Sequence, residues 1–202
     1  MGKEGFWSEA ATEPKRAYRW LLMIGGIPQW MVKKVGKPSF TVSESEHVYL
    51  NHKFWYPGRV EWNTISLTLA DPVTPDAAET MMSILDAAGY KFPNSPAVAT
   101  ESTISKAKAV AALGQVTIQQ IDSEGTEQER WTLKNAWVKD VKFGELDYTS
   151  DDMVDVEIEL RYDWAVLNSN RTGDWKTYTR KVDPGQTTAN VLSAEETAIG
   201  GL

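Results

Sequence analysis

Two histidines and two glutamates lie close together in the chain, and these residue types can bind metal ions. His47 and His52 are separated by an odd spacing, and Glu44 and Glu46 precede them. Side chains alternate between the two faces of a strand, so this spacing would place the imidazoles on opposite faces. Joint ligation would then need a turn between them. The pattern favours ordinary polar residues over a metal site.

A run of carboxylates follows in the stretch GELDYTSDDMVD, which begins at Gly144. Its acidic residues are Glu145, Asp147, Asp151, Asp152 and Asp155. The run lacks the alternating ligands and the central glycine of an EF-hand loop. Asp and Ser side chains readily bond local backbone amides in turns. The run therefore predicts a turn between two strands in preference to a calcium site.

Paired carboxylates can also hydrolyse glycosides, and Asp155, Glu157 and Glu159 would share one strand face. That face should be exposed and lies beside Arg161, so nothing there predicts the apolar pocket that raises the pKa of a catalytic acid. No P-loop, GxGxxG, GxSxG or HExxH motif occurs. The sequence thus predicts no catalytic residue, no metal and no cofactor, and a protein that is not an enzyme.

The aromatic residues Trp55, Tyr56 and Trp62 form a third candidate site. They would suit the sugar-stacking platform of a carbohydrate-binding β-domain. Aromatic side chains in strand-rich proteins more often belong to a core or to an interface. Both interpretations stay open on composition alone.

Composition limits the remaining choices. The chain has 202 residues, is 42% hydrophobic and contains nine tryptophans, which suits one sheet-rich domain. It has no cysteine, which excludes disulfides and thiolate sites. A net charge of -7 argues against tight binding to a nucleic-acid backbone, but not against a surface that nucleic acid slides past. No apolar run reaches the length of a signal peptide or a membrane span, so we expect a soluble protein made in a cytoplasm.

The candidate residues must be positioned by strands. Residues 17–26 form a short apolar run closed by two glycines, which predicts a buried strand. Between Arg59 and Leu69 the apolar residues change parity, which predicts a bulge, a bend or two strands near Asn63 and Thr64. From Val154 to Trp164 apolar and charged residues alternate strictly. One face should be core and the other solvated and mostly acidic.

One helix is expected at about residues 75–88. Thr74 can cap it, Pro75 suits the first helical position, and Gly89 supplies its end. The Ala-rich segment at 102–113 is compatible with a second helix, whose apolar face would be small. Beyond Gly114 the chain reads as a β-meander with a hairpin turn at Gly125.

The sequence therefore predicts a mainly β fold, a β-barrel or sandwich of packed antiparallel sheets with one flanking helix. We expect an N-terminal arm at residues 1–16, the β-domain at 17–167 and a C-terminal extension at 168–202.

An ordered set of segments resembles one family. These are KPSFTV from Lys37, YLNHKFWYPGRVEWNTISLTLADP from Tyr49, AAGY ending at Tyr90, GQVTIQQIDSEG with ERWTLKNAWV, and FGELDYTSDDMVDVEIELRYDWA from Phe143. Together they resemble the tail tube protein of contractile-tailed, T4-like bacteriophages. The resemblance covers roughly residues 37–165 and leaves out both ends of the chain.

The resemblance implies a structural virion protein that assembles in the host cytoplasm and belongs to the phage tail. Six copies would form a ring whose sheets join edge to edge, and stacked rings would form a hollow tube inside a contractile sheath. Expected partners are further copies, the sheath, baseplate and terminator proteins, and a tape-measure protein and DNA inside the lumen, with no membrane. The alternative is the tube of a genome-less injection device, such as a secretion system or bacteriocin.

Within this family context, two surfaces acquire a predicted role. The acidic face would line the lumen and repel DNA; its residues are Asp155, Glu157, Glu159 and Asp163. Residues 44–58 would form a loop or hairpin that contacts a neighbouring subunit. Its residues include Glu44, Glu46, His47, Tyr49, His52, Phe54, Trp55 and Tyr56, with Pro57 and Gly58 as the corner where the chain re-enters the sheet.

Overall fold

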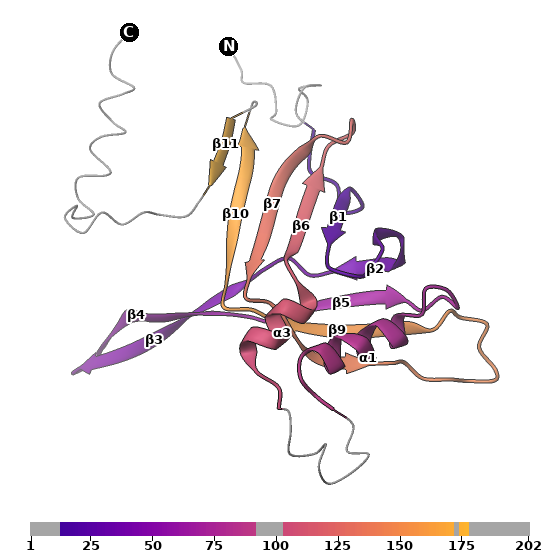
Figure 1. Cartoon of the computed structure of the whole chain (residues 1–202). Coiled ribbons are helices and arrows are strands. Elements are labelled where there is room, and N and C mark those ends of the chain that lie inside the picture. Colours follow the sequence, from indigo (N-terminus) through magenta and orange to yellow (C-terminus); the bar gives the residue numbers. More distant parts are fainter. Residues whose placement is uncertain (1–12, 92–102, 172–173, 178–202) are drawn as a thin grey trace, which may run out of the picture.

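The computed structural model describes residues 13–91, 103–171 and 174–177, and Figure 1 shows their arrangement. Two antiparallel sheets form the body, two helices lie beside it, and a long hairpin projects from it. This confirms the predicted mainly β fold of antiparallel sheets. Most of the predicted N-terminal arm (1–12) and the parts of the C-terminal extension at 172–173 and 178–202 lie outside the described residues.

The larger sheet has the strand order β1-β6-β7-β10-β11. Its strands are β1 (Trp20–Met23), β6 (Val116–Ile121), β7 (Glu127–Lys134), β10 (Trp164–Arg171) and β11 (Asp174–Thr177). The turn between β6 and β7 is the predicted one, and Gly125 there has a φ of 83°. The boundary predicted at residue 167 falls inside β10, so this sheet continues into the region expected to be an extension.

The smaller sheet has the order β2-β5-β9-β8. Its strands are β2 (Val32–Val35), β5 (Ile65–Ala70), β9 (Asp155–Arg161) and β8 (Trp137–Lys142). A short 3-10 helix, η1 (Gln29–Met31), leads into β2. The register of β2 and of β8 shifts by one residue near Lys33 and Lys139, respectively.

The core lies between the two sheets. Alternate residues of β5 and β9 are buried on one face, and they pack with buried residues of β1, β6 and β7: Leu67, Leu69, Val156, Ile158, Leu22, Ile118 and Leu133. Residues of opposite parity in β5 and β9 are polar except Ala70, which leaves the other face of the smaller sheet open to solvent. The period-two pattern thus decides which face becomes core.

The predicted alternation from Val154 to Trp164 holds for only part of its length. Val156, Ile158, Leu160 and Tyr162 are buried, but Trp164 is 47% exposed. The reason is that β9 ends at Arg161 and the chain then passes into β10 of the other sheet.

A second crossing between the sheets interrupts the predicted meander. It lies at Asn135, which has a φ of 55° and separates β7 of the larger sheet from β8 of the smaller one. Near residues 63 and 64 the expected break proves to be a boundary between two strands. There β4 (His52–Trp62) ends and β5 begins at Ile65.

Two helices, α1 (Ala77–Ala87) and α3 (Lys106–Leu113), flank the smaller sheet. The expected cap at Thr74 is wrong, because the Asp76 carboxylate accepts the hydrogen bond from the Glu79 amide at 2.9 Å. Gly89, with a φ of 110°, follows the last turn as predicted. The second helix forms at Lys106–Leu113 and is capped by Ser105.

The Asp76 cap leads to a first prediction. Asp76→Ala should lower the free energy of unfolding by about 1 kcal/mol, because the Glu79 amide loses its acceptor at the helix start. Urea denaturation at pH 7 measures the change. Asp76→Asn keeps an acceptor and serves as the control, and equal losses in both variants would show that the cap is not the cause.

Candidate assembly surfaces

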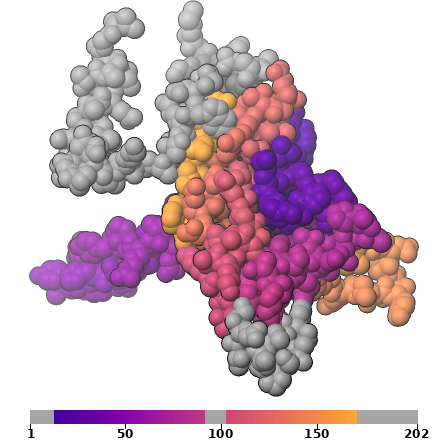
Figure 2. Space-filling view, in the orientation of Figure 1, coloured from indigo at the N-terminus to yellow at the C-terminus, as the bar shows by residue number. Residues whose placement is uncertain are grey.

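Among the elements whose burial is described, the most exposed is the hairpin of β3 (Phe40–Tyr49) and β4 (His52–Trp62), which Figures 1 and 2 show projecting away from the body. Every residue of both strands is exposed except Trp62, which is half-buried. The exposed large apolar side chains are Phe40, Val42, Val48, Tyr49, Leu50, Phe54, Trp55, Tyr56 and Val60. An isolated two-stranded hairpin is marginal in water. A surface of this kind indicates an interface with another chain.

The register sorts the predicted contact residues into two faces. Glu44 pairs with Pro57, and Glu46 with Trp55, on one face. Tyr56, His47, Phe54, Tyr49 and His52 lie on the other, in pairs that include His47 with Phe54 and Tyr49 with His52. Trp55 and Tyr56 therefore point to opposite sides of the hairpin.

Two expectations about this segment are wrong. First, the histidines share a face, because the turn at Leu50 and Asn51 lies between them and places them on different strands. Even so, no group of three or more His, Cys, Asp or Glu residues in the described part of the chain could hold a metal ion.

Second, Pro57 and Gly58 form no corner. They lie inside β4 at a bulge, where Gly58 and Arg59 together oppose Ser43. The Arg59 amide donates to the Ser43 hydroxyl at 2.8 Å. A Cβ atom on Gly58 would lie 2.4 Å from that hydroxyl and 3.0 Å from the Ser43 carbonyl oxygen, so this position favours glycine.

Aromatic contacts connect the base of the hairpin to the core. Phe40 and Trp62 pack edge to face, with ring centroids 5.4 Å apart. Trp62 in turn lies 6.0 Å from the ring of the buried Tyr162. These contacts pack the base of the hairpin against the core.

The loop at residues 143–154 extends from the opposite end of the smaller sheet (Figure 1). It joins β8 to β9 and contains the carboxylate run noted in the sequence. Asp147 accepts hydrogen bonds from the Thr149 amide and hydroxyl, both at 2.9 Å, and these bonds lower the pKa of Asp147. Leu146, Tyr148 and Met153 are exposed there.

The predicted acidic face is the solvent-facing side of the smaller sheet, but its charges are mixed. Across the four strands, Lys34, Thr68, Glu157 and Lys142 lie in one row. The face bears a shallow hollow of about 320 Å³. Lysines of the edge strands pair with the carboxylates of β9, so the expectation of a mostly acidic surface is corrected to one close to neutral.

The ion pairs on this face are close. Lys33 lies 2.6 Å from Asp155, Lys139 lies 2.8 Å from Glu159, and Lys142 lies 3.7 Å from Glu157. Hydrogen bonds from Lys139 and Thr64 lower the pKa of Glu159. Asp163 does not share the face. It bonds Lys106 and Asn135, each at 2.6 Å, and the bond from Lys106 contributes most to its lowered pKa.

An apolar groove of about 390 Å³ lies between α1, the start of α3 and the edge strand β8. Residues that line it include Met82, Leu85, Ile104, Trp137, Val141 and Phe143. The sequence prediction missed this groove. A signal for it exists in α1, where Met82 and Leu85 widen the apolar arc beyond the buried Ala77 and Met81.

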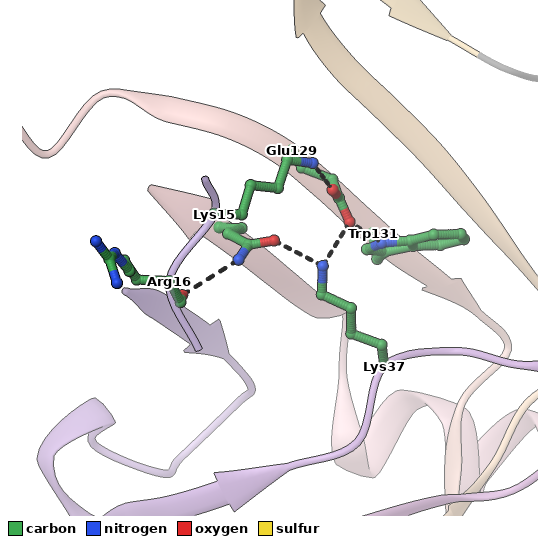
Figure 3. Close-up of polar contacts among 6 residues, drawn as sticks. Lys15, Arg16, Lys37, Glu129 and Trp131 are labelled. Atoms are coloured by element: carbon green, nitrogen blue, oxygen red, sulfur yellow. Dashed lines mark hydrogen bonds and ion pairs between the residues drawn. The ribbon is translucent and has the colours of Figure 1, made fainter. Parts of the chain in front are cut away.

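A buried carboxylate cluster forms the last feature (Figure 3). Glu129 of β7 accepts hydrogen bonds from Lys15, from Lys37 at 2.9 Å and from the Trp131 indole at 2.5 Å. Burial alone would raise the pKa of Glu129, but these three donors outweigh it and lower the pKa to about 2. Lys37 lies between β2 and β3, so the cluster connects the larger sheet to the segment that precedes the hairpin. The sequence prediction also missed this cluster, whose partners are far apart in the chain.

None of the helices in the described residues is long and apolar enough to cross a membrane.

Comparison with known proteins gives a family for this architecture. A family model described as the T4-like virus tail tube protein gp19 matches residues 16–165. No curated protein matches the chain.

Solved structures share the fold. The tube-terminating cap of the anti-feeding prophage is 16% identical, with a TM-score of 0.59, and the match covers 83% of this chain and 100% of that one. A chain of the anti-feeding prophage baseplate is 20% identical, with a TM-score of 0.55, over 77% of this chain and 96% of that one. A chain of the PVC sheath-tube complex, from an extracellular contractile injection system, is 20% identical, with a TM-score of 0.54, over 83% and 99%.

Proposed function

This chain belongs to the T4-like virus tail tube protein family, and we propose that it is the tube subunit that stacks as hexameric rings inside a contractile phage sheath. The exposed hairpin carries this proposal. Its aromatic side chains are open on both faces, which a soluble monomer would not favour and a repeating assembly would bury.

The smaller sheet supplies the means to close a ring. It has four antiparallel strands, and within the described residues its two edges, β2 and β8, are open. Because the strand number is even, joining β8 of one copy to β2 of the next continues the antiparallel pattern without interruption. Closure then removes every open edge of this sheet. The polar face of Glu157 and Lys142 would line the lumen.

Stacking would use the two projections at opposite ends of the same sheet. The hairpin leaves from the end where Val35 and Ile65 lie, and the loop at 143–154 leaves from the end of Lys142 and Asp155. Strands of a barrel run obliquely along its axis, so these projections would reach towards the rings on either side.

The remaining partners follow from this assembly. The outer surface would meet the sheath, and the ends of the tube would meet baseplate and terminator proteins. The lumen would hold a tape-measure protein during assembly and then pass DNA to the host. A tube of a genome-less injection device is the alternative, and neighbouring genes for a capsid and terminase, or for effectors, would discriminate between them.

Negative-stain electron microscopy of the purified chain tests the proposal. We expect rings or hollow tubes. A monomer that persists at high concentration and changes its tryptophan fluorescence on binding glycans would instead support a carbohydrate-binding domain and refute the tube.

The lumen assignment makes a separate prediction. Glu157→Lys with Glu159→Lys would turn a nearly neutral face strongly positive, and we expect DNA to adhere and ejection from intact tubes to slow several-fold. Asp86→Lys with Glu124→Lys, at exposed positions off this face, is the charge-matched control. Unchanged ejection in the Glu157 and Glu159 variant would show that this face does not line the lumen.

A further inference from the structure

The groove beside β8 has an apolar lining that the described residues of its own subunit leave accessible. Met82 and Leu85 of α1 and Val141 of β8 are half-buried, while Ile104 and Phe143 at its rim are exposed. Its volume of about 390 Å³ exceeds that of one large side chain. One wall of the groove is β8, which is an edge strand among the described residues, so a strand that pairs with β8 must pass along the groove.

The edge lysines indicate that strand pairing alone is insufficient. Lys33 and Lys139 sit at register shifts on the two open edges, and lysines and bulges both discourage indiscriminate edge pairing. A correct ring contact therefore needs a second, specific element next to the paired strands.

Trp30 meets this requirement. It lies in η1, directly before β2, and is 65% exposed although the adjacent Met31 is buried. The Leu22 amide donates to the Gln29 side chain at 2.5 Å, which holds η1 against β1 of the larger sheet. Hence η1 lies on the core side of the smaller sheet, the side that α1 and the groove also occupy.

Strand direction then places Trp30 of the next copy beside the groove. If β2 of the next copy pairs antiparallel with β8, its N-terminal end lies beside the C-terminal end of β8. Trp30 lies two residues before β2, and the groove residues at that end of β8 are Val141 and Phe143.

We propose that the groove of each subunit receives Trp30 of the neighbouring subunit in the ring. This rests on the proposed ring and names the side-chain contact that would fix it. A large aromatic side chain that fills an apolar pocket is typical of the residues that dominate interface energies. The aromatic residues of the hairpin are unsuitable occupants in the same ring, because the hairpin leaves from the opposite end of β8.

Cross-linking tests the contact directly, because the chain has no native cysteine. Trp30→Cys combined with Met82→Cys, treated with a short bismaleimide, should give a ladder of covalent oligomers that ends at the ring. Trp30→Cys with Glu124→Cys, in the exposed turn between β6 and β7, is the control and should give no ladder.

Truncation supplies a second readout. Trp30→Ala should leave the melting temperature of the monomer unchanged and raise the protein concentration needed for rings by about tenfold or more, as expected when a central interface tryptophan is lost. Trp30→Phe should restore part of the ring assembly that Trp30→Ala loses. Tyr148→Ala, at an exposed aromatic residue on the 143–154 loop, should leave ring formation unchanged.

The outcomes separate the two proposals. If the unmodified chain forms no rings, the tube proposal fails. If it forms rings, but the Trp30 and Met82 cysteines give no ladder and Trp30→Ala forms rings at the original concentration, another occupant fills the groove and this inference is overturned.

Discussion

Replacing Trp55 or Tyr56 by alanine should leave the subunit folded and prevent tube formation. Each side chain is 55% exposed, so its loss removes little from the core of the monomer. In a stacked assembly the same side chains would be buried against the next ring, where truncating an aromatic residue costs about 2 kcal/mol or more per contact. Every subunit of a tube repeats the loss, so the tube should fail even though the single contact is modest.

The two variants also report on different sides of the hairpin, because Trp55 and Tyr56 lie on opposite faces. If both prevent tubes, the hairpin is enclosed on both faces by neighbouring copies. If only one does, the other face stays open to the lumen or the sheath. Electron microscopy and sedimentation measure assembly, and circular dichroism checks the fold.

Val73→Ala is the matched control, since Val73 is an exposed apolar residue outside the hairpin. It should form tubes like the unmodified chain. Normal tubes from both hairpin variants would contradict a contact role for this segment.

The sequence pattern predicted strands and helices well where the burial of an element depends mainly on its own residues. The alternation of Val156, Ile158 and Leu160 is set by one sheet face, and the parity change before Ile65 marks a real strand boundary. The segment at 44–58 was placed by resemblance, and the structure shows it as a hairpin that is longer at both ends.

Features that depend on contacts between residues far apart in the sequence were not predicted. Trp164 follows the alternation in sequence but enters the other sheet, because strand pairing with β7 decides its environment. The predicted acidic face is close to neutral because Lys139 and Lys142 come from a strand that only the fold brings beside Glu157 and Glu159. His47 and His52 share a face because of the intervening turn, which a count along one strand ignores.

The second large effect is expected at Glu129. Glu129→Gln should lower the free energy of unfolding at pH 7 by about 2–3 kcal/mol, because Lys15 and Lys37 lose a buried carboxylate partner. Both lysines are about half exposed and can be rehydrated, which keeps the loss below that of a fully buried pair.

This loss should depend on pH in a defined direction. The pKa of Glu129 falls from 4.5 to about 2 on folding. The unfolded chain therefore binds this proton more readily, and the stabilisation is fully present above pH 4.5 and declines as the pH falls towards 2. Urea denaturation of both proteins should give a stability difference that is constant near neutral pH and shrinks across that window.

A second glutamate, Glu124, serves as the control that separates the effect of the Glu129 cluster on stability from the general effect of removing an acidic side chain. Glu124→Gln, at an exposed turn position, should change stability little at any pH, whereas a pH-independent loss in Glu129→Gln would show that the ionised carboxylate is not what matters.

Lys37→Met tests the link to the hairpin. If the cluster holds the segment before β3, Lys37→Met and Glu129→Gln should be non-additive in stability, and each should weaken tube formation more than Glu124→Gln does.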